Sequence, residues 1–214
     1  MLSTCLASGG STWQRVGVTT EPAPRRIGAE DSKSRAQLLD AAERLLVEEG
    51  YAAVTSRRVA AAAGLKPQLI HYYFRTMDDL FVEVFRRRAD ENLARFEREV
   101  AAAPSLAALW RFGADPRGAV FTIEFAALAN HRKEIRAEVA RYAERYRRAQ
   151  LEALSAVLAT ERISEVGMPP SAVLLLLTGV TQVMGIERGL GMTTGHKETV
   201  RFIEQAIAQL DSSS

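Results

Sequence analysis

Helical periodicity without an alternating strand is the feature that most limits what this chain can fold into. From Asp31 to the end of the 214 residues, apolar side chains recur every three or four positions. No segment alternates apolar and polar residues as a half-buried strand does. Gly and Pro divide this region into segments whose lengths suit helices. The sequence therefore predicts an all-α fold of about nine helices.

Helix boundaries are set by capping residues and by helix breakers. The first helix is expected after Asp31 or Ser32, which are suitable N-caps, and before Gly50, which suits a helix end. Asp78 and Asp79 open the fourth helix, where negative charge favours the helix dipole. In full, we expect helices at about residues 33–49, 56–63, 67–74, 77–102, 106–112, 117–130, 133–160, 171–188 and 196–210.

The overall charge does not identify a partner. There are 28 Lys and Arg against 26 Asp and Glu, a net charge of +2, so a binding signal must come from local charge. Cys5 is the single cysteine, so nothing requires an oxidising compartment. The most apolar run, residues 172–186, is shorter than the roughly 20 residues that cross a bilayer, and the N-terminus lacks a secretory pattern. We expect a cytoplasmic protein without membrane contact.

Positive charge is concentrated in residues 54–77. This segment has no acidic residue and a local charge of +4, which is typical of a surface that binds phosphate groups. A run of Ala allows two short helices to pack closely, and Gly64 supplies the positive φ of a tight turn. The spacing predicts a helix-turn-helix motif. Its basic residues are Arg57, Arg58, Lys66 and Arg75.

The third expected helix has an inner and an outer face. Ile70 and Phe74 lie four positions apart and are expected to pack inward against Val59. A helix this short gains little from its own core, so its exposed amide and aromatic face indicates a ligand. That face carries Gln68, Leu69, His71, Tyr72 and Tyr73.

Double-stranded DNA is the ligand that these residue types suit. In a major groove Gln68 can bond an adenine edge, His71 a base acceptor, and Leu69 a thymine methyl group. Tyrosine and arginine side chains at the edges of the motif suit phosphate oxygens. The candidate DNA-contacting residues are Ser56, Arg57, Lys66, Gln68, Leu69, His71, Tyr72, Tyr73 and Arg75.

A longer signature runs through this region. It consists of Leu39, Ala42, Leu46, Gly50, Tyr51, residues 54–60, residues 63–65, residues 69–74, Asp79 and Leu80. Over residues 35 to about 85 the sequence resembles the DNA-binding domain of the tetracycline-repressor (TetR) family of bacterial regulators. The resemblance implies an all-helical dimer with a small-molecule pocket in its C-terminal half and a ligand-free form that represses transcription.

Two positions depart from the family's usual pattern. Members commonly have Tyr at the position of His71, which makes the base contact there uncertain and open to pH dependence. Members also commonly have a phosphate-binding Lys where this chain has Met77. Binding is therefore expected to depend more on Arg57, Arg75 and the basic tail, with a shallower salt dependence.

The sequence is expected to divide into three parts. Residues 1–30 are rich in Ser, Thr, Gly and Pro and are expected to be a disordered tail. The tail could be a solvated leader, a DNA-contacting arm, or the product of a misassigned translation start. Residues 31–76 form the expected DNA-binding domain, and residues 77–214 a helical ligand-binding and dimerisation domain.

The last two helices are expected to form a homodimer. The helix at residues 171–188 is apolar nearly all round, and the helix at residues 196–210 has one apolar side. Pairing with the same helices of a second copy buries both, although burial within one chain is the plainer alternative. A palindromic operator with two half-sites also requires a twofold protein.

A small-molecule pocket is expected among the C-terminal helices. Its candidate lining mixes aromatic and flexible apolar side chains with few charges, which favours a largely apolar effector. Glu124, His131 and Gln182 are candidate polar contacts, and each candidate could equally be plain core or surface. The candidate lining residues are Trp110, Phe121, Phe125, Leu128, Tyr142, Tyr146, Gln182 and Met184.

No enzyme motif is present. The sequence lacks nucleophile-elbow, metalloprotease and phosphate-loop patterns, and its three His and one Cys form no ligand spacing, so we expect no catalytic residues, cofactor or metal. The glycines at 189–195 follow a helix rather than a strand and suit a connector. The predicted function is a ligand-responsive DNA-binding regulator that represses transcription. An activator, or a helical small-molecule-binding protein without DNA function, are the alternatives.

Overall fold

The described chain is entirely helical. The structure is a computed structural model and describes residues 32–115, 117–160 and 168–212. Within these residues there are nine α-helices, one short 3-10 helix and no strand. The all-α prediction is therefore confirmed, while the predicted N-terminal tail lies outside the described residues. The elements are α1 (Lys33–Glu49), η1 (Tyr51–Ala53), α2 (Ser56–Ala62), α3 (Gln68–Tyr73), α4 (Met77–Ala102), α5 (Leu106–Gly113), α6 (Arg117–His131), α7 (Lys133–Thr160), α8 (Pro170–Gly189) and α9 (His196–Ser212).

Local capping explains most helix ends. The Ser32 hydroxyl accepts the Arg35 N–H at 3.2 Å and caps α1. Thr76 and Asp79 form a reciprocal capping box at the start of α4, with both hydrogen bonds at 3.0 Å. The bounds of α1, α4 and α7 are as predicted, and the other helices differ by one or two residues. The 3-10 helix η1 was not predicted.

Two apolar cores stabilise the fold, and α4 takes part in both. The first joins α1, α2 and α3 to the N-terminal part of α4 and to α6, and it includes Leu38, Phe85 and Phe125. The second lies around Phe96 and joins the rest of α4 to α5, α7, α8 and α9. The expected boundary between residues 76 and 77 therefore falls inside the first core, so the two expected domains share α4.

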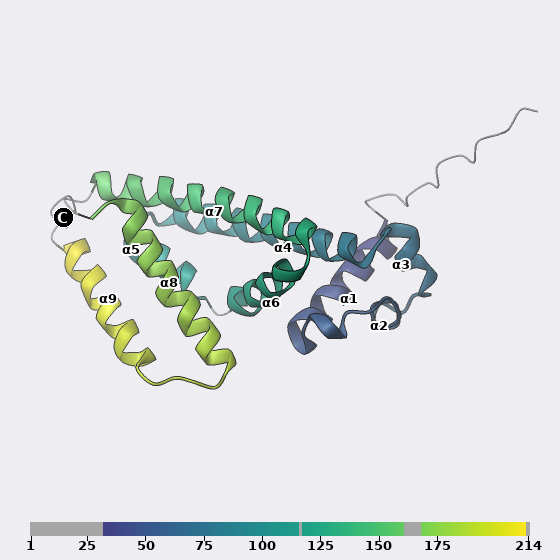
Figure 1. Cartoon of the computed structure of the whole chain (residues 1–214). Helices are drawn as coiled ribbons and strands as arrows, with labels where there is room; N and C mark the ends of the chain where they lie inside the picture. The colour runs from purple at the N-terminus through teal and green to yellow at the C-terminus, as the bar shows by residue number, and fades with distance from the viewer. Residues whose placement is uncertain (1–31, 116, 161–167, 213–214) are drawn as a thin grey trace, which may run out of the picture.

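The first three helices and the last two lie at opposite ends of the molecule. Helices α1 to α3 form one end, α8 and α9 form the other, and the long helices α4 and α7 run between them (Figure 1). Ion pairs fix α4 to its neighbours: Arg87 bonds Asp40 at 2.6 Å and Glu43 at 2.8 Å on α1, and Arg86 bonds Glu138 at 2.8 Å on α7. The hydrogen bond from Arg86 lowers the pKa of Glu138, which keeps this link charged.

The apolar helix near the C-terminus is longer than the sequence predicted. The apolar run lies in α8, whose 20 residues and mean hydropathy of 1.4 are sufficient to cross a membrane by length and composition alone. However, α8 packs against α6 and α7 and shares the second core through Leu174. It is therefore a helix of the folded C-terminal region, with one side packed and one side exposed.

Candidate nucleic-acid interface and ligand cavity

The helix-turn-helix is set by a cap, a glycine and three buried side chains. Thr55 caps α2 by accepting the Arg58 N–H at 3.3 Å. Gly64 has a φ of +68°, as its place in the tight turn predicts. Val59 and Ile70 are fully buried and Phe74 is nearly so, which confirms that this side of α3 faces inward. The packing fixes which face of α3 is presented to a ligand.

The opposite face of α3 is open to solvent. Half of the surface of Tyr72 is exposed, and its ring contacts that of Tyr73 edge to face at 4.9 Å between centroids. Leu69 and Tyr73 also pack against the first core, so their exposed area is smaller than the sequence suggested. Six of the nine candidate DNA-contacting residues are exposed and three are half-buried. The exposed residues are Arg57, Lys66, Gln68, His71, Tyr72 and Arg75; the half-buried ones are Ser56, Leu69 and Tyr73.

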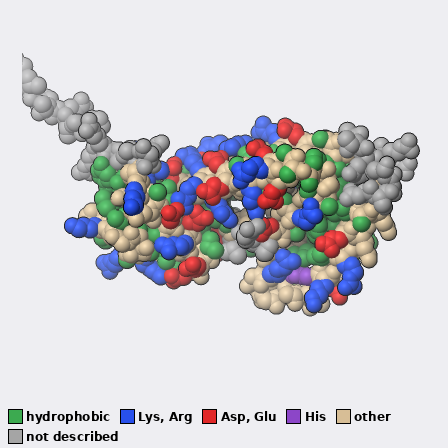
Figure 2. Space-filling view, turned by 180° about the vertical axis from the view of Figure 1, so that it is seen from behind, with side chains coloured by type: hydrophobic (Ala, Val, Ile, Leu, Met, Phe, Trp, Pro, Cys, Tyr) green, Lys and Arg blue, Asp and Glu red, His purple; other side chains and the backbone are tan. Residues whose placement is uncertain are grey.

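The four basic residues of this region differ in their partners. Arg58 is bonded to both carboxylate oxygens of Glu49, at 2.6 and 2.8 Å. In residues 32–115, 117–160 and 168–212, Arg57, Lys66 and Arg75 have no ion pair. These three cations are therefore available for phosphate groups. Figure 2 shows Lys and Arg side chains at the outer edge of the N-terminal end, with Asp and Glu more frequent toward the middle of the molecule.

Glu124 links this region to the C-terminal half. Its carboxylate accepts the Tyr51 N–H at 3.0 Å, just beyond the end of α1. Gly50 has a φ of +80°, and a Cβ added there would lie 3.7 Å from the oxygens of the same carboxylate. Glu124 does not line the cavity described below, and neither does the exposed His131. Neither side chain is therefore a polar group of this cavity, and their role as ligand contacts stays a prediction.

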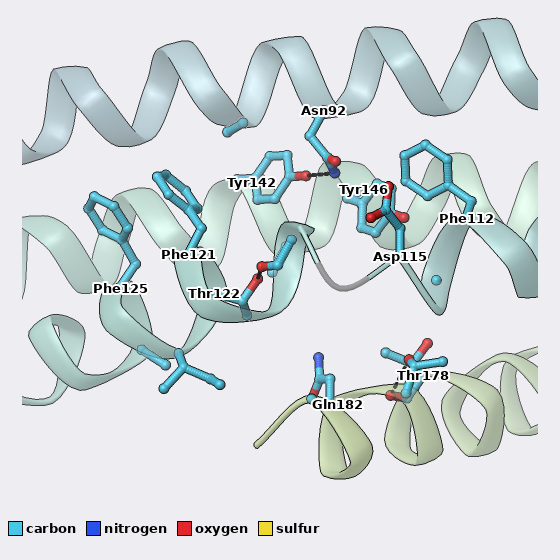
Figure 3. Close-up of a pocket in the computed structure, with 18 of the residues that line it drawn as sticks. Asn92, Phe112, Asp115, Phe121, Thr122, Phe125, Tyr142, Tyr146, Thr178 and Gln182 are labelled. Atoms are coloured by element: carbon cyan, nitrogen blue, oxygen red, sulfur yellow. Dashed lines mark hydrogen bonds between the residues drawn. The ribbon is translucent and has the colours of Figure 1, made fainter. Parts of the chain in front are cut away.

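A cavity of about 350 Å³ lies among α4, α5, α6, α7 and α8 (Figure 3). Six of the eight candidate residues line it: Trp110, Phe121, Phe125, Tyr142, Tyr146 and Gln182. Leu128 and Met184 do not line it. Leu128 is buried in the first core, and Met184 is buried elsewhere on α8, so their contact with a ligand stays a prediction that this cavity does not support. Both side chains lie on the expected helices but on other faces.

Aromatic rings form a continuous wall of the cavity. Tyr142 and Tyr146 stack with centroids 5.8 Å apart, and Phe121 and Phe125 are 4.6 Å apart. Phe85 of α4, which sequence reasoning missed, contacts Tyr142, Phe121 and Phe125. A wall of this kind accommodates a flat or branched apolar group.

Polar groups from α4 and from the end of α5 also line the cavity, contrary to the expectation of few charges. Asn92 donates a hydrogen bond to the Tyr142 hydroxyl at 2.7 Å (Figure 3). Arg95 bonds Asp115 at 2.7 Å and lies over the Phe112 ring at 4.4 Å. Burial raises the pKa of both tyrosine hydroxyls, Tyr142 and Tyr146, so they stay protonated at neutral pH.

Comparison with known proteins identifies the family. The family model described as "Bacterial regulatory proteins, tetR family" matches residues 38–84. The HTH-type transcriptional regulator BetI of Rhizobium meliloti is 30% identical over 152 residues, which cover 65% of this chain and 74% of BetI. The chain belongs to the TetR family. It is thus a transcriptional regulator of that family, as its helix-turn-helix suggested.

Solved structures share the fold of this TetR-family regulator. A transcriptional regulator from Saccharomonospora viridis in complex with choline is 18% identical, with a TM-score of 0.62 over 72% of this chain and 84% of its own. FadR from Bacillus subtilis in complex with stearoyl-CoA is 16% identical, with a TM-score of 0.54 over 73% of this chain and 87% of its own. At these identities the likeness concerns the fold alone.

The far end of this TetR-family chain exposes a large apolar surface. Leu175 and Leu176 of α8 are 63% and 59% exposed, and Phe202 of α9 is 71% exposed. Val183 and Ile186 extend the exposed side of α8. Isolated exposed apolar residues are common, but a concentration of them on the two C-terminal helices is typical of an interaction surface. In the described part of the chain, no group of three or more His, Cys, Asp or Glu is placed to hold a metal.

Proposed function

We propose that this protein is a homodimeric repressor that binds a palindromic operator and is released by a small, largely apolar effector. One observation carries the proposal: Phe85, Phe121 and Phe125 belong both to the core of the DNA-binding end and to the cavity lining. An effector that moves these rings must also disturb the packing that orients α1 and α4. Effector binding and DNA release are then coupled, because the effector binds one arrangement of these helices more tightly than the other.

DNA recognition is assigned to the exposed face of α3 and its flanks. Gln68, His71 and Leu69 are proposed to read base edges in the major groove. Phosphate groups are proposed to be bound by the cations Arg57, Lys66 and Arg75, which are unpaired among the described residues. Hydroxyl groups that can donate further hydrogen bonds to phosphates belong to Ser56, Tyr72 and Tyr73. In this scheme residues 31–76 make the DNA contacts, and residues 77–214 bind ligand and dimerise, with α4 shared.

The dimer interface is assigned to α8 and α9. These two helices lie at the end of the molecule opposite to α3 (Figure 1) and expose apolar side chains, so a second copy can bind there without blocking the DNA-binding face. A four-helix interface between two copies removes this apolar surface from water. It also sets the spacing of the two recognition helices, which is what an operator with two half-sites requires.

The effector is proposed to occupy the cavity. Choline and stearoyl-CoA, the ligands in the two solved relatives, differ widely in size and charge. The volume of about 350 Å³ and the aromatic wall in this chain suit a small molecule with an apolar body. We place this regulation in the bacterial cytoplasm, where its DNA lies.

A DNA titration tests the proposed function. Purified protein is titrated against the DNA immediately upstream of its own gene at two salt concentrations, with unrelated DNA as competitor. We expect selective binding that weakens steeply with salt, because several phosphates are neutralised. Binding that depends neither on DNA sequence nor on salt concentration, with this upstream DNA and with other genomic DNA alike, would contradict the proposal.

Replacing Glu124 with Ala tests the link between the cavity helix α6 and the DNA-binding end. The Tyr51 N–H loses its acceptor, so backbone opening around η1 becomes easier. We expect amide hydrogen exchange in residues 50–55 to accelerate about tenfold, and DNA affinity to fall several-fold. Hydrogen-exchange mass spectrometry measures the first effect and a DNA titration the second.

Glu97→Ala is the matched control for that variant. Glu97 is an exposed acid of α4 for which the described part of the chain shows no ion pair. Its removal should leave both measurements unchanged. Wild-type exchange rates around Tyr51 in the Glu124 variant would show that the carboxylate does not hold this segment.

A further inference from the structure

The charge of the cavity lining is strongly one-sided. Among the residues that the structure describes, four arginines line the cavity against a single acid, Asp115. Arginine is always charged near neutral pH, so the lining carries excess positive charge whatever the solution conditions. The four arginines are Arg88, Arg95, Arg147 and Arg188.

The one acid is already neutralised. Asp115 is bonded to Arg95 at 2.7 Å, and its side chain is only 15% exposed. Arg95 is in turn held over the Phe112 ring. A cation entering the cavity would find aromatic rings but no free carboxylate, and it would lie among arginines of the same sign.

The hydrogen-bonding groups of the cavity favour an acceptor. The Tyr142 oxygen accepts from Asn92, which leaves its own O–H available to donate. The hydroxyl groups of Thr178 and Thr181 donate hydrogen bonds to backbone carbonyl oxygens of α8 itself, at 2.7 and 3.0 Å. Side-chain amides such as that of Gln182 can both accept and donate, and the other free groups, a phenol O–H and the arginine N–H groups, are donors only.

Arg147 is the arginine best placed to hold a ligand. It belongs to the side of α7 that faces the cavity, where lining residues recur every three or four positions: 139, 142, 143, 146, 147 and 150. It is half-buried, and it has no ion pair within the parts of the chain that the structure describes. Arg88 lies 3.9 Å from Glu43, Arg95 is paired with Asp115, and Arg188 is exposed.

We propose that the effector is an organic anion, a carboxylate carried on an aromatic or branched apolar body, and that Arg147 binds its carboxylate. The inference rests on the proposed function, since it names the chemical class of the effector. The apolar body lies against the wall formed by Phe121, Phe125 and Tyr142. Arginine suits this role because its planar guanidinium can donate two parallel hydrogen bonds to a carboxylate.

Calorimetric titration with defined probes tests the chemical class. The full-length protein is titrated with phenylacetate, 4-phenylbutyrate and octanoate, with the primary amide of each acid, and with choline. We expect at least one acid to bind, its amide to bind about tenfold more weakly or less, and choline not to bind. Absence of acid binding, or amide or choline binding as tight as that of the acids, would overturn the proposal.

Neighbouring arginines provide a matched pair of variants. Arg147→Gln should weaken acid binding about tenfold while leaving amide binding and the thermal midpoint nearly unchanged. Arg148→Gln is the control, because Arg148 is exposed and does not line the cavity. An unchanged acid affinity in Arg147→Gln would overturn the role of Arg147.

DNA release is measured separately, so that the two proposals fail in different ways. If the acids bind but operator DNA stays bound, the chemical class of the cavity ligand holds and the coupling to DNA fails. If choline or an amide releases the DNA while the acids do not, the regulator stands and the anionic effector is wrong.

Discussion

Replacing Phe202 with Glu is expected to convert the dimer to a monomer and to weaken operator binding roughly 100-fold or more. Phe202 of α9 is 71% exposed in the single chain, and α8, at the same end of the molecule, also exposes leucines. Burying a carboxylate at the centre of an apolar interface without a partner is strongly unfavourable. A monomer engages one half-site only, so it loses the gain that comes from binding two half-sites at once. Sedimentation velocity and a DNA titration measure the two effects.

Val47→Glu is the control for the dimer variant. Val47 is an exposed apolar residue of α1, far along the chain from α8 and α9. The substitution introduces the same charge at an exposed position outside α8 and α9, and the protein should remain dimeric. A dimeric Phe202→Glu protein with wild-type operator affinity would contradict the assignment of α8 and α9 as the interface.

Replacing both Arg57 and Tyr72 with Ala is expected to weaken operator binding about 100-fold, with the dimer intact. Arg57 is an unpaired cation at the start of α2 in the described part of the chain, and Tyr72 is half-exposed on α3. Both are assigned to phosphates, so the loss should be similar for all sequences. The salt dependence should become shallower by about one released ion per lost charged contact.

Two further variants separate charge from base recognition. Arg58→Ala should have a much smaller effect than the loss of Arg57, because Arg58 is paired with Glu49 at 2.6 Å. Gln68→Ala should alter the preferred sequence instead of lowering affinity uniformly. If replacing Arg57 and replacing Arg58 with Ala weakened operator binding equally, the ion pair of Arg58 would not distinguish the two residues. The assignment of Arg57 to a phosphate would then fail.

Much of the fold follows from local sequence, because local interactions set it. The start of α4 was predicted from Asp78 and Asp79, and the capping box at Thr76 and Asp79 is the physical reason. The turn at Gly64 follows from the tolerance of glycine for positive φ. By contrast, η1 has only three residues, too few to show a helical period.

The cavity was only partly predictable, because its shape depends on contacts distant in sequence. Phe121 and Phe125 could be chosen as aromatic residues of an apolar helix, but nothing local distinguishes them from Leu128, which faces the first core. The polar groups Asn92 and Arg95 belong to α4, whose stripe was interpreted as apolar packing. They become cavity residues only when α5 and α7 pack beside them.

Selection of bound sequences from random duplex DNA by the purified full-length protein tests whether it is a dimeric, sequence-specific regulator. We expect enrichment of one inverted repeat whose half-sites lie about one or more helical turns apart, roughly 34 Å or a multiple of it. We also expect this enrichment to be lost with the Arg57 and Tyr72 double variant. Recovery of sequences with no common motif, or of a motif without twofold symmetry, would contradict a dimeric sequence-specific regulator.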